Sequence, residues 1–533
     1  KEFGSGLVQV CTFGDKMDVV WMHRYKLPLI SVINKYGKME NTGIPELEGL
    51  KLKDAKVKMI ELLEKQGKVI NKKPTQQTVK VHDRCKTPIE LLASWQWFAD
   101  IRTTGKKIKE LAHQVKWVPD FGISYLIDWV EGAEWDWVIS RQRVFGTPIP
   151  FYYCEKCNET MTEEITKLPF YSEKSSKRKC KCGGEMLPET STCDCWVDSS
   201  ITPLIISGWP DDKKKFEKMY PISLRPQGVE IVRTWAFYTV YRSGIGITGK
   251  APWETLLLNG NVLAPDGKKM SKSAGNVISP TDLQKEYPTD AIRQWAAMSG
   301  AMAKDRPFSY EDIKYAKSFL NKLWNASKLV ELSIVDYNGK EVEFEKLSVI
   351  DKWIISRMNQ MITEGTEAME KFEFHHLIGK MQNFFWKEFC DNYLEYIKHR
   401  TYGSDAKSKH AAQFVLHYVL LNSIKLLAPI APHMTEEIYH EVFKGKESLH
   451  KSEWSKAGKI DDNAIATMEI FNAIVSEIRQ YKAKNKLAQN AEIEKVKITS
   501  PHEISSELIG ELKSISKIKI IEQKKGTELK VEF

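Results

Sequence analysis

The sequence lacks an apolar run long enough to cross a bilayer. The longest candidate, residues 411–432, is interrupted by Gln413, His417, Asn422 and Lys425, whereas a spanning helix needs about 18 or more almost uninterrupted apolar residues. We likewise expect no secretory signal. We therefore expect no membrane contact and a cytoplasmic location, in which the nine cysteines stay reduced and available for metal.

A large excess of one charge is also missing. The chain carries 79 Lys and Arg against 70 Asp and Glu, a net charge of +9. This modest excess is compatible with a polyanionic partner, but a well-solvated surface explains it equally well. The length of 533 residues exceeds a single hydrophobic core and predicts roughly three to five domains.

The texture of the sequence changes near residue 310. Before it, Gly, Pro and short apolar runs alternate with helical stretches, as in an α/β layer architecture. After it, Ser309 and Asp312 form a capping-box pattern that opens a series of helices. We expect helices within 351–362, 386–398, 435–443 and 463–487, followed by a strand, a helix and two strands to the end.

The strongest metal signal is two close pairs of cysteines, CEKC and CKCGG: Cys154, Cys157, Cys180 and Cys182. Four thiolates on two turns suit a closed, structural zinc site, although a gap of one residue in the second pair is less usual than two. The alternative is that these cysteines are reduced and bind no metal. We interpret the rival pair Cys193 and Cys195, beside Trp196, as strand residues near a pocket.

A second pattern is misleading. Residues 244–251, GIGITGKA, match most of a phosphate-binding loop. However, Ala251 stands where that loop needs a hydroxyl, and the segment follows a helical pattern instead of a strand. We expect a glycine turn that leads from a helix into a strand.

Residues 267–276, GKKMSKSAGN, combine lysines with small residues. Such a run contributes little to a core and is typical of a mobile loop that meets an anion, although a solvated basic turn is the simpler reading. Lys269–Ser273, KMSKS, resembles the signature loop of the class I aminoacyl-tRNA synthetases.

Further segments resemble the valine, isoleucine and leucine group of that family and occur in its order. They are VHDRCKTPIE (81–90), WDWVISRQRVFGTPIPFYYC (135–154), CDCWVDSS (193–200), GVEIVRTWAFY (228–238) and LLAPIAPHMTEEIY (426–439). CTFGDKMDVVWMHRYKLPL (11–29) and the cysteine pairs point to the valyl-tRNA synthetases of archaeal type.

The resemblance implies ATP-dependent ligation of valine to tRNA(Val), with Mg²⁺ accompanying ATP. Lys269 and Lys272 would be catalytic, and Met270, Ser271 and Ser273 would complete the loop that closes over the triphosphate. As charge builds on the phosphate oxygens, mobile ammonium groups stabilise that state.

The same resemblance assigns the residues around the adenylate. Trp137 and Trp196 would wall the aminoacyl pocket, a narrow slot for a branched aliphatic side chain. Gly228 and Glu230 would contact the adenylate ribose, with Glu where bacterial relatives carry Asp.

Asp15 and Asp18 match the acidic end of the family's editing domain. Asp18 would hold the α-amino group of a misactivated amino acid, whereas a solvated helix N-terminus is the plainer interpretation. Editing suits this substrate, because an apolar pocket rejects the nearly isosteric threonine only about a hundredfold.

The resemblance also predicts an α/β fold class with a partial Rossmann-type catalytic domain and the following divisions. These are the end of the editing domain (1–45), a connecting and catalytic segment (46–145), a zinc ribbon (146–190), the second catalytic half with the KMSKS loop (191–310), a helical anticodon-binding bundle (311–455) and a helix with a small α/β unit (456–533). Lys482, Lys484 and Lys486 either meet tRNA phosphates or simply favour a helix end.

Two family elements do not occur in this sequence: the HIGH-type half of the ATP site and the threonine-rich front of the editing domain. In the family both lie upstream of the part that residue 1 matches. We therefore expect a portion of a longer, monomeric protein that by itself binds zinc but neither activates valine nor edits. The alternatives are an isoleucyl- or leucyl-tRNA synthetase, and a non-catalytic, zinc-containing tRNA-binding module.

Overall fold

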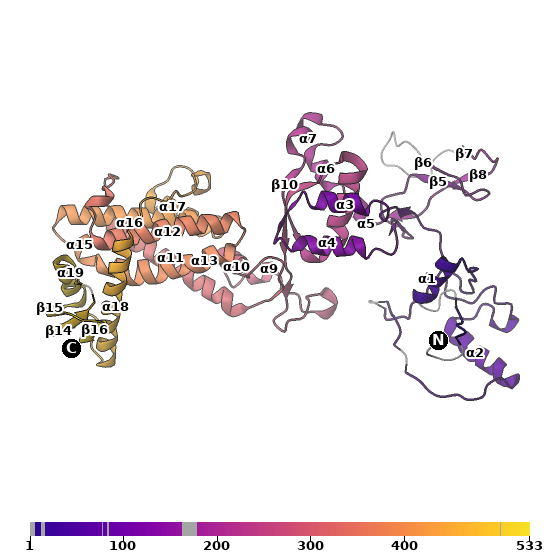
Figure 1. Cartoon of the computed structure of the whole chain (residues 1–533), viewed down its shortest axis with the longest axis horizontal. Coiled ribbons are helices and arrows are strands. Elements are labelled where there is room, and N and C mark those ends of the chain that lie inside the picture. The colour runs from indigo at the N-terminus through magenta and orange to yellow at the C-terminus, as the bar shows by residue number, and fades with distance from the viewer. Residues whose placement is uncertain (1–5, 12–15, 77, 83–84, 163–177, 502) are drawn as a thin grey trace. The chain divides into compact units, whose positions relative to one another are not determined.

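The computed structural model describes residues 6–11, 16–76, 78–82, 85–162, 178–501 and 503–533 (Figure 1). The chain divides into two compact units, one formed by Lys1–Ala99 with Asp136–Asp194 and the other by Asp100–Trp135 with Cys195–Phe533. Within the described ranges, no helix has both the length and the apolar character that a bilayer crossing requires.

The first unit combines helices with short antiparallel strands. Its helices are α1 (Lys16–Tyr25), η1 (Pro45–Leu47) and α2 (Leu52–Lys65). Two small ladders pair β1 (Phe98–Ala99) with β3 (Trp137–Val138) and β4 (Ser140–Arg141) with β9 (Thr192–Cys193).

A four-stranded antiparallel sheet completes this unit. Its order is β6 (Thr160–Thr162), β5 (Phe151–Cys154), β8 (Glu185–Pro188) and β7 (Arg178–Lys179). Among its described residues, Tyr152, Cys154, Cys180 and Met186 form a small buried cluster, with Met161 partly buried against them. A cluster of this size stabilises a sheet only weakly, so a cross-link such as a metal ion would add to its stability.

The second unit begins with a parallel sheet of order β10 (Ile222–Gly228), β11 (Trp253–Asn259) and β2 (Lys116–Val118). Around it lie α3 (Gly105–Ala112), α4 (Gly122–Glu131), α5 (Cys195–Ser199), α6 (Thr202–Ser207) and α7 (Lys213–Met219). Gly122 lets α4 approach closely, because a Cβ there would stand 2.4 Å from Leu258 Cδ1. This is the expected α/β layer.

The crossover between β10 and β11 contains the pattern that resembled a phosphate-binding loop. The chain is helical from η3 (Val229–Ile231) through η4 (Val232–Ala236), α8 (Phe237–Thr239) and the π-helical η5 (Val240–Thr248). It then turns at Gly249, whose φ is 71°, and enters β11. The prediction of a glycine turn from helix into strand is confirmed.

A connecting region follows the sheet. It contains β12 (Val262–Leu263) paired in parallel with β13 (Arg306–Pro307), the short turn η6 (Lys272–Ala274), and the helices α9 (Pro280–Leu283) and α10 (Thr289–Ala297). A buried cluster around Leu283, Trp295 and Phe308 joins this region to the next helix, α11 (Tyr310–Ser333).

From α11 onward the chain forms a helical bundle, whose colour in Figure 1 runs from salmon through orange to the yellow of α18. Its other elements are η7 (Phe344–Lys346), α12 (Val349–Glu370), α13 (Phe374–Asn383), η8 (Phe384–Tyr393), α14 (Leu394–Tyr396), α15 (Lys398–Thr401), α16 (Ala406–Leu427), α17 (Pro432–Phe443), η9 (Leu449–Lys451) and α18 (Asp462–Lys484). Ser309 caps α11 by accepting the Asp312 N–H, as the capping-box pattern predicts.

A small α/β unit closes the chain, with β14 (Ile493–Ser500), α19 (Ser506–Ser516), β15 (Ile518–Lys525) and β16 (Lys530–Glu532). The strand order is β15-β14-β16, parallel in the first pair and antiparallel in the second. This confirms the predicted strand, helix, strand and strand. Val496, Ile498 and Leu512 join the same buried cluster as the bundle, so the two parts share one core.

Candidate ATP loop and cysteine cluster

The KMSKS segment is an ordered double turn. The first turn closes through the Ala264 N–H on the Lys268 carbonyl at 2.8 Å and uses Gly267 with φ of 78°. In the second, the Ser271 N–H reaches Asn276 Oδ1 at 2.9 Å, and Asn276 Nδ2 donates to the Lys269 carbonyl at 3.2 Å. The side chain of Asn276, in the sequence AGN after the loop, therefore links the two ends of this turn.

The two catalytic lysines predicted for this loop have different surroundings. Lys272 opens the short turn η6 and is exposed. Lys269 Nζ lies 2.7 and 2.8 Å from the two carboxylate oxygens of Glu230. The structure therefore brings together two residues that were predicted to serve the triphosphate and the ribose of one nucleotide.

Glu230 is placed by the parallel sheet. Gly228 is the last residue of β10, and Glu230 follows in the first helical turn after it. No atom lies within 4 Å of a Cβ built on Gly228, so the strand end is open. The carboxyl ends of parallel strands are where α/β sheets bind nucleotides.

The two tryptophans predicted for the aminoacyl pocket belong to different units. Trp137 on β3 is buried, and its indole N–H donates to Asp194 Oδ2 at 3.0 Å. Trp196 on α5 is half-buried. The prediction that both neighbouring cysteines are strand residues is wrong for Cys195, because the strand ends at Cys193 and Cys195 begins α5.

The predicted editing residues are only partly described. Asp15 lies outside the described residues. Asp18 sits in the first turn of α1 and is half-buried. An acidic group in the first turn is favourable without any ligand, so its location is compatible with both interpretations.

The four predicted metal ligands converge. The sulfurs of Cys154, Cys157, Cys180 and Cys182 all lie within 4.8 Å of one another. The closest pairs, Cys154 with Cys182 and Cys157 with Cys180, are 3.5 Å apart. Tetrahedral zinc with Zn–S bonds of about 2.3 Å would separate its sulfurs by about 3.8 Å, so the donor set fits a metal ion of this kind.

Backbone turns hold these sulfurs. The Asn158 N–H bonds to the Cys154 carbonyl, and the Gly183 N–H to the Cys180 carbonyl. A Cβ on Gly184 would stand 2.7 Å from the Cys154 sulfur and 3.3 Å from the Cys182 sulfur. The second glycine of CKCGG is therefore required for the cluster to close.

Lys482 is not available to phosphate, contrary to one prediction. Its side chain is 1% exposed, and its Nζ donates to the carbonyls of Gln489 and Ser516, each at 2.8 Å. Ser516 is the last residue of α19, so the ammonium group caps that helix. The sequence indicated that Lys482 lies near the end of α18, but no local pattern indicated that the end of α19 meets it.

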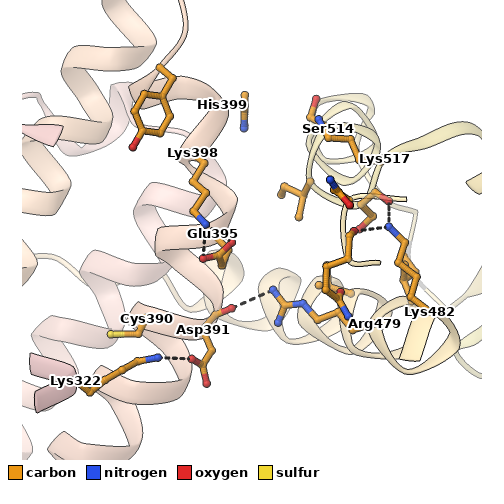
Figure 2. Close-up of a pocket in the computed structure, with 17 residues that line it drawn as sticks. Lys322, Cys390, Asp391, Glu395, Lys398, His399, Arg479, Lys482, Ser514 and Lys517 are labelled. Atoms are coloured by element: carbon orange, nitrogen blue, oxygen red, sulfur yellow. Dashed lines mark hydrogen bonds and ion pairs between the residues drawn. The ribbon is translucent and has the colours of Figure 1, made fainter. Parts of the chain in front are cut away.

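A cavity of about 710 Å³ lies beside Lys482, between the bundle and the small α/β unit (Figure 2). Lys322, Lys398, Arg479 and Lys517 contribute cations to its wall, while Asp391 and Glu395 contribute carboxylates. Burial raises the pKa of the Cys390 thiol to about 12, which makes this cysteine a poor nucleophile. The cavity is thus a cationic groove without a reactive group among these residues.

Two residues that the sequence analysis missed join the connecting region to the bundle. Asp290 Oδ2 accepts the Met434 N–H at 2.7 Å, in the first turn of α17. Arg293 donates to the carbonyls of Pro429 and Ile430 at 2.9 and 3.1 Å, just after α16 ends. The carboxylate of Asp290 thus lies at the start of α17, and the guanidinium of Arg293 lies at the end of α16. The helix dipole favours both placements. Their spacing on one face of α10 was the available signal.

Comparison with known proteins agrees with this arrangement. The family described as tRNA synthetases class I (I, L, M and V) matches residues 30–309, and the anticodon-binding domain of tRNA ligase matches residues 351–498. The valine–tRNA ligase of Methanocaldococcus jannaschii is 40% identical over 543 residues, covering 100% of this chain and 61% of that protein. The valine–tRNA ligase of Pyrococcus furiosus is 41% identical over 553 residues, covering 99% and 62%.

Solved structures share the fold at lower identity. Methionyl-tRNA synthetase of Mycobacterium tuberculosis with methionyl-adenylate has a TM-score of 0.52 and 15% identity, over 70% of this chain and 72% of that one. The LeuRS–tRNA–LeuAMS complex of Agrobacterium radiobacter has a TM-score of 0.50 and 19% identity, over 75% and 51%.

The chain spans about three fifths of the length of the curated relatives it matches. The family match covers residues 30–309, more than half of the chain. The match to the anticodon-binding domain follows it along the chain, over residues 351–498. The chain belongs to the class I tRNA synthetases of the isoleucine, leucine, methionine and valine group.

Proposed function

We propose that the protein containing this chain is a valine–tRNA ligase, which activates valine with ATP and transfers it from valyl-adenylate to tRNA(Val). Relatives that bear this name match nearly the whole chain at 40 and 41% identity. The structural observation that carries the proposal is the ion pair between Lys269 and Glu230 at the open end of β10. It unites the loop and the strand end that the reaction needs.

In the proposed reaction the valine carboxylate attacks the α-phosphorus of ATP, and the bond to pyrophosphate breaks. Negative charge accumulates on the phosphate oxygens and the leaving group, with Mg²⁺ bound to the nucleotide. Lys269 and Lys272 stabilise this charge more than the ground state, which lowers the barrier. Ser271, Ser273 and Met270 shape the loop that carries them.

The resting ion pair defines how ATP enters. Lys269 and Glu230 keep 66% and 48% of their side chains exposed, and exposed pairs of this kind are weak. The triphosphate therefore displaces Glu230 from Lys269 at little cost. Glu230 is then released to accept a hydrogen bond from a ribose hydroxyl, beside Gly228.

We further propose that the cysteine cluster binds a structural zinc ion. The convergence of four sulfurs and the small core of their sheet support this assignment. A closed four-thiolate site leaves no position for substrate. Its contribution would be to hold the ribbon of residues 146–190 in shape.

The tRNA would bind to the helical bundle, within the proposed anticodon-binding domain 311–455. The cationic cavity beside Lys322 and Arg479 supports a contact with RNA in this region. Hydrolytic editing of threonine would use Asp18, with Asp15 nearby in sequence, to hold the α-amino group. The remaining divisions, 1–45, 46–145, 191–310 and 456–533, and a monomeric state belong to the same proposal.

The loop lysines provide the test. We expect Lys269→Ala in the native protein to lower kcat of valine-dependent ATP–pyrophosphate exchange by about a hundredfold or more, because it removes a group that stabilises developing charge. Lys268→Ala is the matched control, since Lys268 lies in the same loop but pairs with Asp266 at 3.1 Å. Equal losses from the two changes would contradict the assigned role of Lys269.

A further inference from the structure

Asp194 is a buried carboxylate to which the sequence motifs assign no role. It is 4% exposed and lies between β9 and α5. Its Oδ2 accepts two hydrogen bonds, from the indole N–H of Trp137 at 3.0 Å and from Arg141 at 2.7 Å. We propose that Asp194 is a positioning residue, which fixes the indole ring of Trp137 and thereby sets how strictly the aminoacyl pocket selects its substrate.

The backbone holds both ends of this contact. The ladder of β4 and β9 places Ser140 opposite Cys193, and the Asp194 N–H donates to the Ile139 carbonyl at 2.7 Å. Trp137 is held on the other side by its pairing with Ala99. The carboxylate and the indole therefore start from one frame of neighbouring strands, so the contact has little freedom to shift.

Arg141 makes the buried carboxylate tolerable. Its guanidinium donates to the carbonyls of Val138 and Ser140 at 2.7 and 2.9 Å and to Asp194. A buried charge without a partner is costly, whereas a paired one that also receives other donors is retained. Arg141 thus holds the Asp194 side chain in place, and Asp194 in turn orients Trp137.

The indole needs such an anchor because it has a single donor on one edge. Rotation of the ring about its bond to Cβ is broad and roughly two-fold. Without an acceptor at its N–H, the ring can turn over and present a different edge. Apolar pockets distinguish one methylene by only about 10- to 200-fold, so a wall that moves loses much of the preference for valine over isoleucine.

The inference rests on the proposed function of Trp137 and is tested in the native protein. We expect Asp194→Ala to raise KM for valine and to lower the valine-to-isoleucine ratio of kcat/KM by about tenfold, with kcat for valine changed only a few fold. In a Trp137→Phe background, which has no N–H to hold, Asp194→Ala should add little. Asp194→Asn, which keeps an acceptor, provides a milder variant if alanine impairs folding.

The same unit offers a matched control. Trp97 donates its indole N–H to Glu189 at 2.6 Å, a contact of the same chemistry without a role in the proposed pocket. Trp97→Phe and Glu189→Gln should change stability while leaving the valine-to-isoleucine ratio within twofold. An equal effect of these control changes on the ratio would overturn the proposal, as would an Asp194→Ala protein with unchanged selectivity.

A second readout does not depend on activity. In the full chain labelled with ¹⁵N-tryptophan, the Trp137 indole resonance, identified by its loss in Trp137→Phe, should shift and exchange faster in Asp194→Ala. If this resonance is unchanged, the positioning role is wrong. If it shifts as expected while the native protein shows no valine-dependent exchange, the contact stands and the proposed function fails.

Discussion

Gly184 shows how a single residue controls a site. A Cβ at this position would approach the Cys154 and Cys182 sulfurs at 2.7 and 3.3 Å. The first distance is shorter than real Cβ contacts allow, so any side chain must push a ligand away. The cluster therefore depends on a residue that supplies no donor side chain.

We expect Gly184→Ala to abolish stoichiometric zinc binding, because two of the four sulfurs would have to move. The measurement is metal content of the purified chain together with competition by a chromophoric chelator. Gly379→Ala, in α13 with nothing within 4 Å of its Cβ, should bind as the wild type does. Full zinc occupancy in Gly184→Ala would show that the cluster is not the metal site.

Single residues could be proposed from the sequence where short spacing carries the chemistry, and the four cysteine sulfurs do converge. The two cysteine pairs and the loop lysines could be found because their neighbours are local in sequence. Asp194 could not, since its partners Trp137 and Arg141 lie more than 50 positions away. The phosphate interpretation of Lys482 fails because the carbonyls of Gln489 and Ser516 take up its ammonium group, and local patterning does not indicate that the end of α19 meets it.

Among the elements, α10 lies along the chain between the KMSKS loop and the helical bundle. Asp290 and Arg293 form hydrogen bonds with the backbone where α16 ends and α17 begins. Met270 of the KMSKS loop and Met434 of α17 both pack on the cluster that contains Trp295 of α10. One buried cluster, to which α10 contributes Ala291 and Trp295, therefore packs against both the KMSKS loop and the start of a bundle helix.

Asp290→Ala should remove about 1–2 kcal/mol from the stability of the α17 start, since it deletes an acceptor at a helix N-terminus. Hydrogen exchange at the Met434 amide and the denaturant midpoint would record the loss. Asp282→Ala, which removes an exposed partner of Lys285, is the control. Unchanged protection at Met434 would mean that the bond to Asp290 does not hold the helix.

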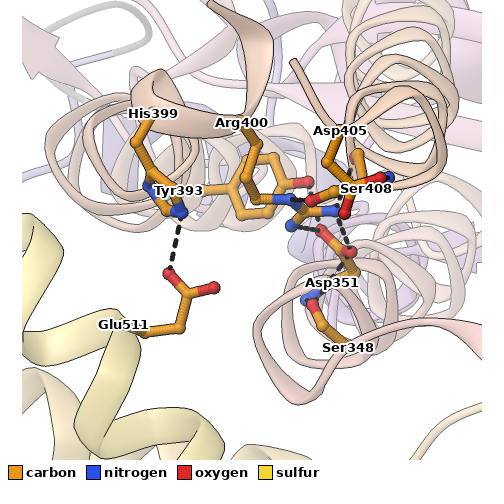
Figure 3. A network of polar contacts seen from close by, with 8 residues as sticks. All are labelled: Ser348, Asp351, Tyr393, His399, Arg400, Asp405, Ser408 and Glu511. Atoms are coloured by element: carbon orange, nitrogen blue, oxygen red, sulfur yellow. Dashed lines mark hydrogen bonds and ion pairs between the residues drawn. The ribbon is translucent and has the colours of Figure 1, made fainter. Parts of the chain in front are cut away.

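The docking of α19 on the bundle involves buried charge (Figure 3). His399 Nε2 lies 3.3 Å from Glu511 of α19. Burial raises the pKa of Glu511 above 4.5, despite the opposing effect of His399 and Arg400, and Asp351 and Glu507 raise it further. Arg400 itself pairs with the fully buried Asp351.

This raised pKa gives stability a defined pH dependence. The folded protein binds the Glu511 proton more tightly than the unfolded chain, so stability falls as the pH rises from about 4.5 through the raised pKa. Glu511→Gln should remove this decline and leave the protein more stable at pH 7. Denaturation of both proteins between pH 4 and 8 tests this, with Glu528→Gln as control, since Glu528 is exposed and is not among the groups that shift the pKa of Glu511. A wild-type slope in Glu511→Gln would refute the assignment.

Elements with a clear period or cap were predictable from the sequence, and those shaped by packing were not. The helix expected at 463–487 is α18, which ends at Lys484. The helix expected at 386–398 is instead divided among the π-helical η8, α14 and α15. Phe384, Phe385 and Phe389 are all buried there, and local patterning gives no sign of such a change in helical winding.

At the scale of the whole molecule, a parallel sheet and the KMSKS loop precede a bundle that shares its core with a small α/β unit. The sequence indicated this order, because the change of texture near residue 310 separates alternating elements from helices. It could not indicate the shared core, which joins Phe471 of α18 to Leu508 of α19. Long-range burial of this kind leaves no local pattern.

We propose that the complete protein activates valine for tRNA(Val). The most direct measurement is ATP–pyrophosphate exchange by the native protein with valine, isoleucine, leucine and methionine, followed by charging of tRNA with the preferred amino acid. We expect exchange that depends on valine and charging of tRNA(Val). Preference for another of these amino acids, or the absence of exchange with all four, would contradict it.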